Sequence, residues 1–128
     1  MKHYLMPFIM CSVFHAHAYA EEADQSQAAI KHLESASVAA QSGNSESAGQ
    51  ETELAKKHVI AHQAKHPLHP TSRNPDEIAR RDHVKQALSK IGEAASLVKQ
   101  GQVEYVSGAT GDAIQQIQLE TQSDQTVN

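Results

Sequence analysis

The sequence of 128 residues has a single cysteine and no tryptophan, and it has few aromatic residues of any kind. Cys11, both phenylalanines and two of the three tyrosines lie within the first 20 residues, so Tyr105 is the only aromatic residue further on. The rest of the chain therefore offers no disulfide and no thiolate ligand for a metal. Its core has to come from Ala, Leu, Ile and Val, and alanines bury little area each. We expect modest stability, to which a ligand that binds only the folded chain would add.

The sequence also lacks a surplus of positive charge and any recognisable catalytic motif. The whole chain has a formal net charge of −4, and without Lys2, the one charged residue among the first 20, the balance is −5. A mildly acidic chain does not fit nucleic-acid binding. The sequence contains no H-E-x-x-H motif and no glycine-rich phosphate loop, and none of its Ser and Thr residues lies within a known nucleophile motif. We therefore expect a protein that is not an enzyme and has no nucleic-acid partner.

The beginning of the chain has the layout of a secretory signal peptide. A short basic start precedes an apolar run over residues 4–14 and the A-x-A site Ala18-Tyr19-Ala20. The run is too short to span a bilayer, so no stable membrane span is expected. A lipoprotein signal at Cys11 is disfavoured, because large residues stand directly before it. We predict cleavage after residue 20 and a periplasmic location.

Apolar residues recur at helical spacing in four segments that are separated by glycine or proline. The predicted helices cover residues 24–42, 45–65, 75–99 and 102–119. The predicted inward-facing residues are Ala29, Ile30, Leu33, Ala36, Ala40, Ala48, Ala55, Val59, Val84, Ala87, Leu88, Ile91, Ala94, Ala95, Val98, Val103, Val106, Ala113, Ile114 and Ile117. This pattern predicts an all-α, antiparallel four-helix bundle over residues 21–120. The polar residues 121–128 are expected to be a disordered tail.

A faint internal repeat supports this architecture. One constant shift along the chain places Gly43 on Gly101 and Val59 on Ile117. Each half is then a helical hairpin that cannot bury its apolar face alone. Two such hairpins, packed together, make the predicted bundle.

Histidines are the most distinctive residues of the second predicted helix. His58, His62 and His66 recur every four residues, which stacks them along one face of a helix. Imidazole is the commonest protein ligand for borderline metals, so the ladder predicts a metal site. The alternative interpretation is a polar helix that happens to be rich in histidine.

Two further histidines approach the ladder when residues are counted across the turns. His32 should lie within one turn of His58, and His83 should lie opposite Val59. Each of the two, taken alone, is also typical of an ordinary surface residue. His69 lies in a proline-flanked loop and could add a flexible ligand.

The predicted ligand set suits Cu(II), Ni(II) or Zn(II), with copper strongest by the general affinity order. It consists of His58, His62 and His66 with His32 and His83 in support, and Asp82 and Glu34 are further candidates.

Two stretches resemble the small metal-binding protein family. They are Ala-Ile-Lys-His-Leu-Glu at residues 29–34 and Glu-Leu-Ala-Lys-Lys-His-Val-Ile-Ala-His at residues 53–62, with a glycine-containing turn between them. Members of that family are periplasmic, histidine-rich four-helix bundles of repeated helix pairs that bind copper and other divalent metals. The resemblance implies His32, His58 and His62 as ligands. That family has histidines on all four helices, whereas the fourth predicted helix here has none, so we expect few sites, at one end of the bundle.

The first hypothesis for function is a periplasmic protein that buffers or scavenges divalent copper, nickel or zinc without any chemical change. Its affinity should fall as the pH drops through about 6.5, because a protonated imidazole cannot bind a metal. The alternative is a helical scaffold or stress-related interaction module of the envelope, in which the histidines are incidental. No particular protein partner follows from the sequence.

Overall fold

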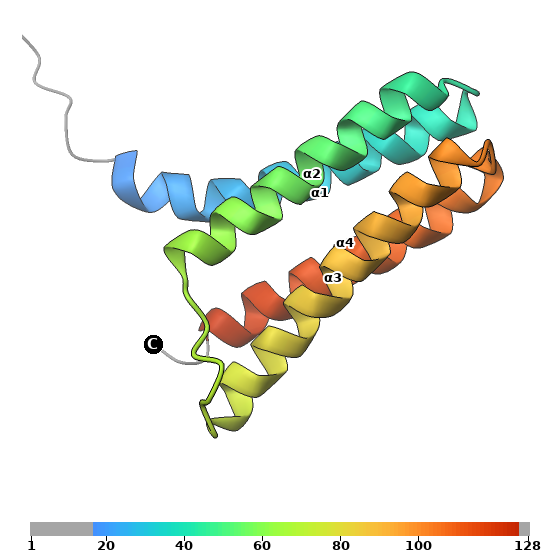
Figure 1. Ribbon diagram of the computed structural model, residues 1–128. Coiled ribbons are helices and arrows are strands. Elements are labelled where there is room, and N and C mark those ends of the chain that lie inside the picture. The colour runs from blue at the N-terminus through green and yellow to red at the C-terminus, as the bar shows by residue number, and fades with distance from the viewer. Residues whose placement is uncertain (1–16, 126–128) are drawn as a thin grey trace, which may run out of the picture.

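The computed structural model describes residues 17–125, which form four α-helices and one short 3-10 turn (Figure 1). The helices are α1 (His17–Gln41), α2 (Ser45–Lys65), α3 (Pro75–Lys99) and α4 (Val106–Gln125), and the 3-10 turn η1 covers Val103–Tyr105. Residues 17–125 contain no strand. The predicted all-α fold is confirmed.

The two hairpin turns end their first helices in the same way. Gly43 and Gly101 have φ of +77° and +72°, a left-handed conformation that glycine adopts without strain. The amide of Gly43 donates to the carbonyl of Ala40, and the amide of Asn44 donates to that of Ala39. The same pair of hydrogen bonds recurs at the equivalent positions of the second turn. The internal repeat is therefore a structural repeat as well.

The starts of α2 and α3 follow from side-chain caps. The Asn44 side chain accepts a hydrogen bond from the amide of Ser47 at 3.0 Å. Asn74 caps α3 by accepting from the amide of Asp76 at 3.0 Å, with Pro75 at the first helical position. Both boundaries agree with those predicted from the sequence.

The helices pack as two hairpins, α1 with α2 and α3 with α4 (Figure 1). Between the hairpins, α1 lies beside α4 and α2 lies beside α3, so α2 and α4 are diagonal to each other. Both hairpin turns are at one end of the bundle. The loop of residues 66–74 is at the other end, together with the start of α1 and the end of α4. The hairpins are thus related by an approximate two-fold axis along the bundle.

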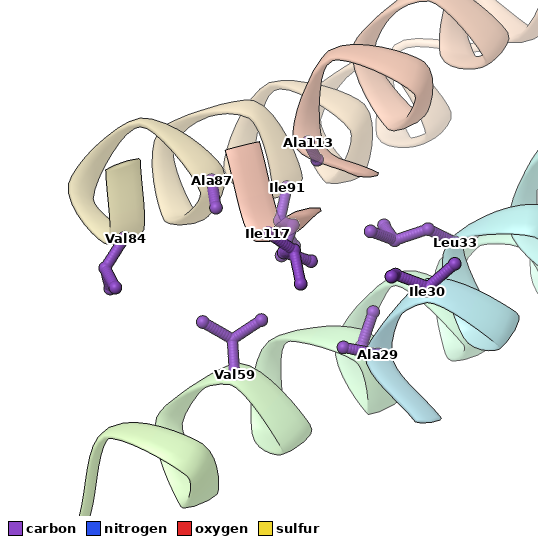
Figure 2. Packing of buried hydrophobic residues seen from close by; sticks show 10 residues of the cluster. Ala29, Ile30, Leu33, Val59, Val84, Ala87, Ile91, Ala113 and Ile117 are labelled. Carbon is purple, nitrogen blue, oxygen red and sulfur yellow. The ribbon is translucent and has the colours of Figure 1, made fainter. Parts of the chain in front are cut away.

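The core lies between the hairpins and uses the apolar face that the sequence predicted. Figure 2 shows Val59 and Leu33 of the first hairpin directed toward Val84, Ile91 and Ile117 of the second. Alanines supply much of the remaining buried surface. The residue that breaks this face in the sequence of α2 is Thr52. Thr52 is fully buried there. Its hydroxyl donates to the carbonyl of Ala48 at 2.7 Å, so the polar group is not left without a partner in the core.

Two helix boundaries differ from those predicted from the sequence. The expectation of a disordered tail from residue 121 is wrong for residues 121–125, which continue α4 and place Asp124 beside Arg80. The first helix begins at His17 rather than at Asp24. Residues 1–16 and 126–128 lie outside the described part, so the signal peptide stays a prediction. No helix within residues 17–125 is long and apolar enough to cross a membrane.

Candidate metal centre

The three histidines of the ladder on α2 contact two different helices, α1 and α4, and do not form one face of a single site. A step of four residues turns a helix by about 400°, so each successive histidine is rotated by roughly 40° around the axis. His58 is consequently directed toward α1, where it meets Gln25. His62 and His66 approach α4.

His58 and His32 form a stacked pair between α2 and α1. Their ring centroids are 5.2 Å apart and the ring planes differ by 12°. Nδ1 of His32 donates to Oε2 of Glu51 at 2.6 Å, and Nδ1 of His58 donates to Oε1 of Gln25 at 2.7 Å. The prediction that His32 lies within one turn of His58 is confirmed.

These hydrogen bonds determine which nitrogen of each ring is available. The amide oxygen of Gln25 and the carboxylate of Glu51 can only accept, so both Nδ1 atoms carry the proton. In the neutral ring, the lone pair then belongs to Nε2. Metal-binding histidines typically donate their second nitrogen to a carboxylate or carbonyl in this way.

His83 does not join this pair, contrary to the expected position beside His58 and His62. Its Nδ1 donates to Oε1 of Gln116 on α4 at 2.8 Å. The internal repeat relates Gln25 to His83 and His58 to Gln116, so the two hairpins contain the same hydrogen bond with its partners exchanged. His83 is therefore a single imidazole that faces the inside of its own hairpin.

The other two histidines of the ladder belong to a charged group where the hairpins meet. We call His62, His66, Arg80, Glu120 and Asp124 the axial cluster. Nε2 of His62 is 3.3 Å from Oε2 of Glu120, and Nδ1 of His66 is 4.0 Å from Oδ2 of Asp124. The Arg80 guanidinium contacts both carboxylates at 3.1 Å. The cluster thus links α2, α3 and α4.

Two charged side chains of the axial cluster are buried, which strengthens the interaction between their charges. The side chains of Glu120 and Arg80 are only 4% and 12% exposed. Burial alone would raise the pKa of the Glu120 carboxyl, but His62 and Arg80 beside it lower the pKa by more, so it lies below its ordinary range. Glu120 is therefore ionised, and its carboxylate lies between the imidazole of His62 and the guanidinium of Arg80.

The lowered pKa of Glu120 predicts part of the response to acid. A depressed carboxyl pKa contributes stability that is complete above the ordinary pKa and is lost as the pH falls through the folded-state value. We expect the substitution Glu120→Gln to reduce the loss of stability between about pH 5 and pH 3. Urea unfolding midpoints measured across that range, with a chelator present, test this. Parallel pH profiles for the two proteins would contradict it.

His62 is the one buried imidazole of the described residues without a hydrogen bond. Its exposed fraction is 8%, and neither ring nitrogen has a hydrogen-bond partner, because the 3.3 Å approach of Glu120 lacks the required geometry. A cavity of about 10 Å³, close to the size of one water molecule, lies next to it and is lined also by Ser26 and Glu120. The ring of His62 therefore relies on its ion-pair contact with Glu120.

The acidic and basic members of the axial cluster were not predicted from the sequence. The sequence pattern places Asp124 in the polar tail, and the pair Arg80-Arg81 is typical of a solvated helix face. The repeat contained the missing signal, because it places Glu120 on His62 and Asp124 on His66. Equivalent residues of two hairpins can touch only near the axis that relates them.

The remaining candidate ligands lie outside both groups. His69 is exposed in the loop, and its backbone amide donates to Oε1 of Glu77 at 2.7 Å. Glu34 and Asp82 are exposed on helix surfaces. Within the part of the chain that the structure describes, no three His, Cys, Asp or Glu side chains are placed so that they could hold a metal ion together. Comparison of the chain with family models, curated proteins and solved structures found no match.

Proposed function

We propose that this protein binds divalent transition-metal ions, Cu(II) foremost and Ni(II) or Zn(II) with it, and acts as a periplasmic buffer or scavenger. The observation that carries the proposal is the stacked pair of His32 and His58, in which both Nδ1 protons are engaged by acceptors. Two Nε2 lone pairs are then available on neighbouring rings. Binding of this kind requires no chemical change in the ion.

One ion could be shared by the two rings only after both side chains rotate. Bonds of about 2.0–2.1 Å to imidazole nitrogen place two ligand nitrogens about 3–4 Å apart. The ring centroids are 5.2 Å apart and the ring planes differ by 12°, so both rings would have to turn toward a shared ion to meet that requirement. The remaining coordination positions would be filled by water, because His32 and Glu51 are 29% and 27% exposed. Such an open site suits reversible exchange, which a buffer needs.

The residues that accept hydrogen bonds from His32 and His58 would influence the affinity of the two rings for a metal ion. Glu51 supports the His32 ring with a carboxylate, and Gln25 supports the His58 ring with an amide. Loss of such a supporting residue typically weakens metal binding by roughly 10–100-fold. We therefore expect Glu51→Gln to weaken Cu(II) binding at the pair without removing it.

Calorimetric titration with Cu(II) tests the proposal on the exported and processed protein. The double variant His32→Ala/His58→Ala is expected to lose one equivalent of binding, whereas the matched control His83→Ala keeps it. His83 is suitable because its Nδ1 makes the same hydrogen bond to a glutamine but has no second imidazole beside it. Equal heats and equal stoichiometry for the double variant and the control would contradict the proposal and favour an interaction module without metal.

A further inference from the structure

A groove of about 580 Å³ lies between α2 and α3, on the half of the bundle nearer the hairpin turns (Figure 1). Its surface is mostly apolar, and Leu54 of α2 contributes to it together with Ala95 and Val98 of α3. Neither the His32–His58 pair nor the axial cluster lines this groove. What the groove binds is therefore a question separate from metal binding.

The internal repeat explains why the groove is open. On the opposite side of the bundle, between α1 and α4, the hydroxyl of Ser37 donates to the hydroxyl of Ser107 at 2.9 Å. The side-chain amide of Gln41 donates to the same oxygen at 3.1 Å. In the repeat, Ser37 corresponds to Ala95 and Ser107 corresponds to Gly49, and neither of these two residues has a side chain that can make such a hydrogen bond. The hairpins are therefore linked between α1 and α4 at this level, whereas a groove remains between α2 and α3.

The side of the groove formed by α2 has a self-complementary order of polar side chains. Four exposed residues that line it follow one another at steps of three or four, and they are Glu46, Gln50, Glu53 and Lys57. When two copies of this stretch lie antiparallel with their midpoints together, Glu46 is level with Lys57 of the partner subunit. Gln50 is then level with Glu53 of the partner subunit. Because a two-fold interface is reciprocal, each of these pairs occurs twice.

We propose that this groove is the interface of a homodimer, in which the α2 helices of two copies lie antiparallel and each covers the groove of the other. The inference goes beyond the proposed function, because no metal ligand takes part. Gly49 lines the groove and has no side chain, which allows another helix to approach closely. In the same register it is level with Leu54 of the partner subunit. A Cβ atom at Gly49 would lie 3.6 Å from Cγ1 of Val98, an ordinary contact, so the packing of α2 on α3 does not itself require glycine here.

The charges beside the groove favour a second copy over other partners. Within residues 17–125, Lys57 makes no ion pair, and Glu46 accepts a hydrogen bond only from Gln50, at 3.5 Å. Pairing between copies places each of these two charges beside an opposite one, while the apolar surface of the groove is removed from water. A partner of uniform charge would instead meet a like charge at one end of the stretch. The pattern therefore matches a surface with the same order of charges running in the opposite direction.

Sedimentation velocity of the exported protein over a concentration series, at low ionic strength and with a chelator present, tests the proposal. Small interfaces are typically transient, so we expect a dimer that dissociates on dilution. Glu46→Lys places like charges at both ends of the interface and should weaken self-association at least about tenfold. The matched control is Glu104→Lys, at the exposed residue that corresponds to Glu46 in the repeat, and it should associate like the unmodified protein. A protein that is monomeric at every concentration, or equal weakening by both substitutions, would overturn the proposal and leave the groove to a partner of another kind.

A mixture of two variants tests the register itself. Glu46→Lys and Lys57→Glu should each associate weakly alone, because each places like charges opposite one another. In a mixed dimer of the two, both contacts again join opposite charges, so we expect the mixture to regain the affinity of the unmodified protein. The double variant Glu46→Lys/Lys57→Glu should regain it without mixing. Both positions are exposed, so the core is unchanged, and circular dichroism verifies that the variants fold. If neither the mixture nor the double variant associates, the proposal is wrong.

Discussion

Glu120→Ala is expected to lower the free energy of unfolding by about 3 kcal/mol, measured without metal, since removing one member of a buried ion pair generally costs about 3–5 kcal/mol. The other charge then stays buried without a partner. Here Arg80, at 12% exposure, would lose one of its two carboxylates. Asp124 still contacts it at 3.1 Å, so we place the cost at the lower end of that range.

Urea unfolding, followed by far-ultraviolet circular dichroism with a chelator present, measures the effect. The matched control is Glu34→Ala, an exposed position within α1, for which we expect a change of no more than about 0.5 kcal/mol. Domains of this size have a total stability of about 5–15 kcal/mol, so the two substitutions are easily distinguished. If both variants unfold at the same urea concentration, the axial cluster does not stabilise the fold.

Leu33→Ala is expected to cost about 3 kcal/mol, within the usual range of about 2–5 kcal/mol for a buried leucine. Leu33 is fully buried and is among the largest side chains of the core, together with Ile91, its equivalent in the repeat. The same cluster contains Ala29, Ala55, Ala87 and Ala113. These alanines are too short to fill the cavity left behind. The bundle has little other apolar surface to compensate.

The control for the core prediction is Leu54→Ala on α2. Leu54 is 37% exposed, so we expect a loss below about 1 kcal/mol in the same urea measurement. A similar cost for both leucines would mean that burial between the hairpins is not what stabilises this protein. A cost for Leu33→Ala much above about 5 kcal/mol would mean that the hairpins separate altogether.

The fold was predictable because local chemistry determines most of it. Asn44 and Asn74 cap the helices where the sequence predicts caps. Gly43 and Gly101 end helices because glycine adopts the left-handed conformation without strain. The helical spacing of apolar residues identified the buried face correctly. The sequence does not predict the end of α4, because residues 121–128 are polar and the partner of Asp124 lies on α3, a contact that only the packing reveals.

The candidate site was predictable only within one hairpin. Counting across the tight turn at Gly43 placed His32 beside His58, because that turn sets the pairing of α1 and α2. Counting across the loop of residues 66–74 failed for His83, since a longer loop does not determine which faces of α2 and α3 meet. The axial cluster depends on contacts between diagonal helices, which no count along the chain provides.

The position of His62 opposite Glu120 on the approximate two-fold axis has a bearing on ancestry. If the chain arose by duplication of a hairpin that once paired with an identical copy, this position would have faced itself. Two histidines or two glutamates would then have met, and two buried glutamates would repel each other. An imidazole opposite a carboxylate is possible only when the copies are free to differ, as they are once joined in one polypeptide. Divergence at this position would then have made the pairing of the two different hairpins more stable than the pairing of either hairpin with an identical copy.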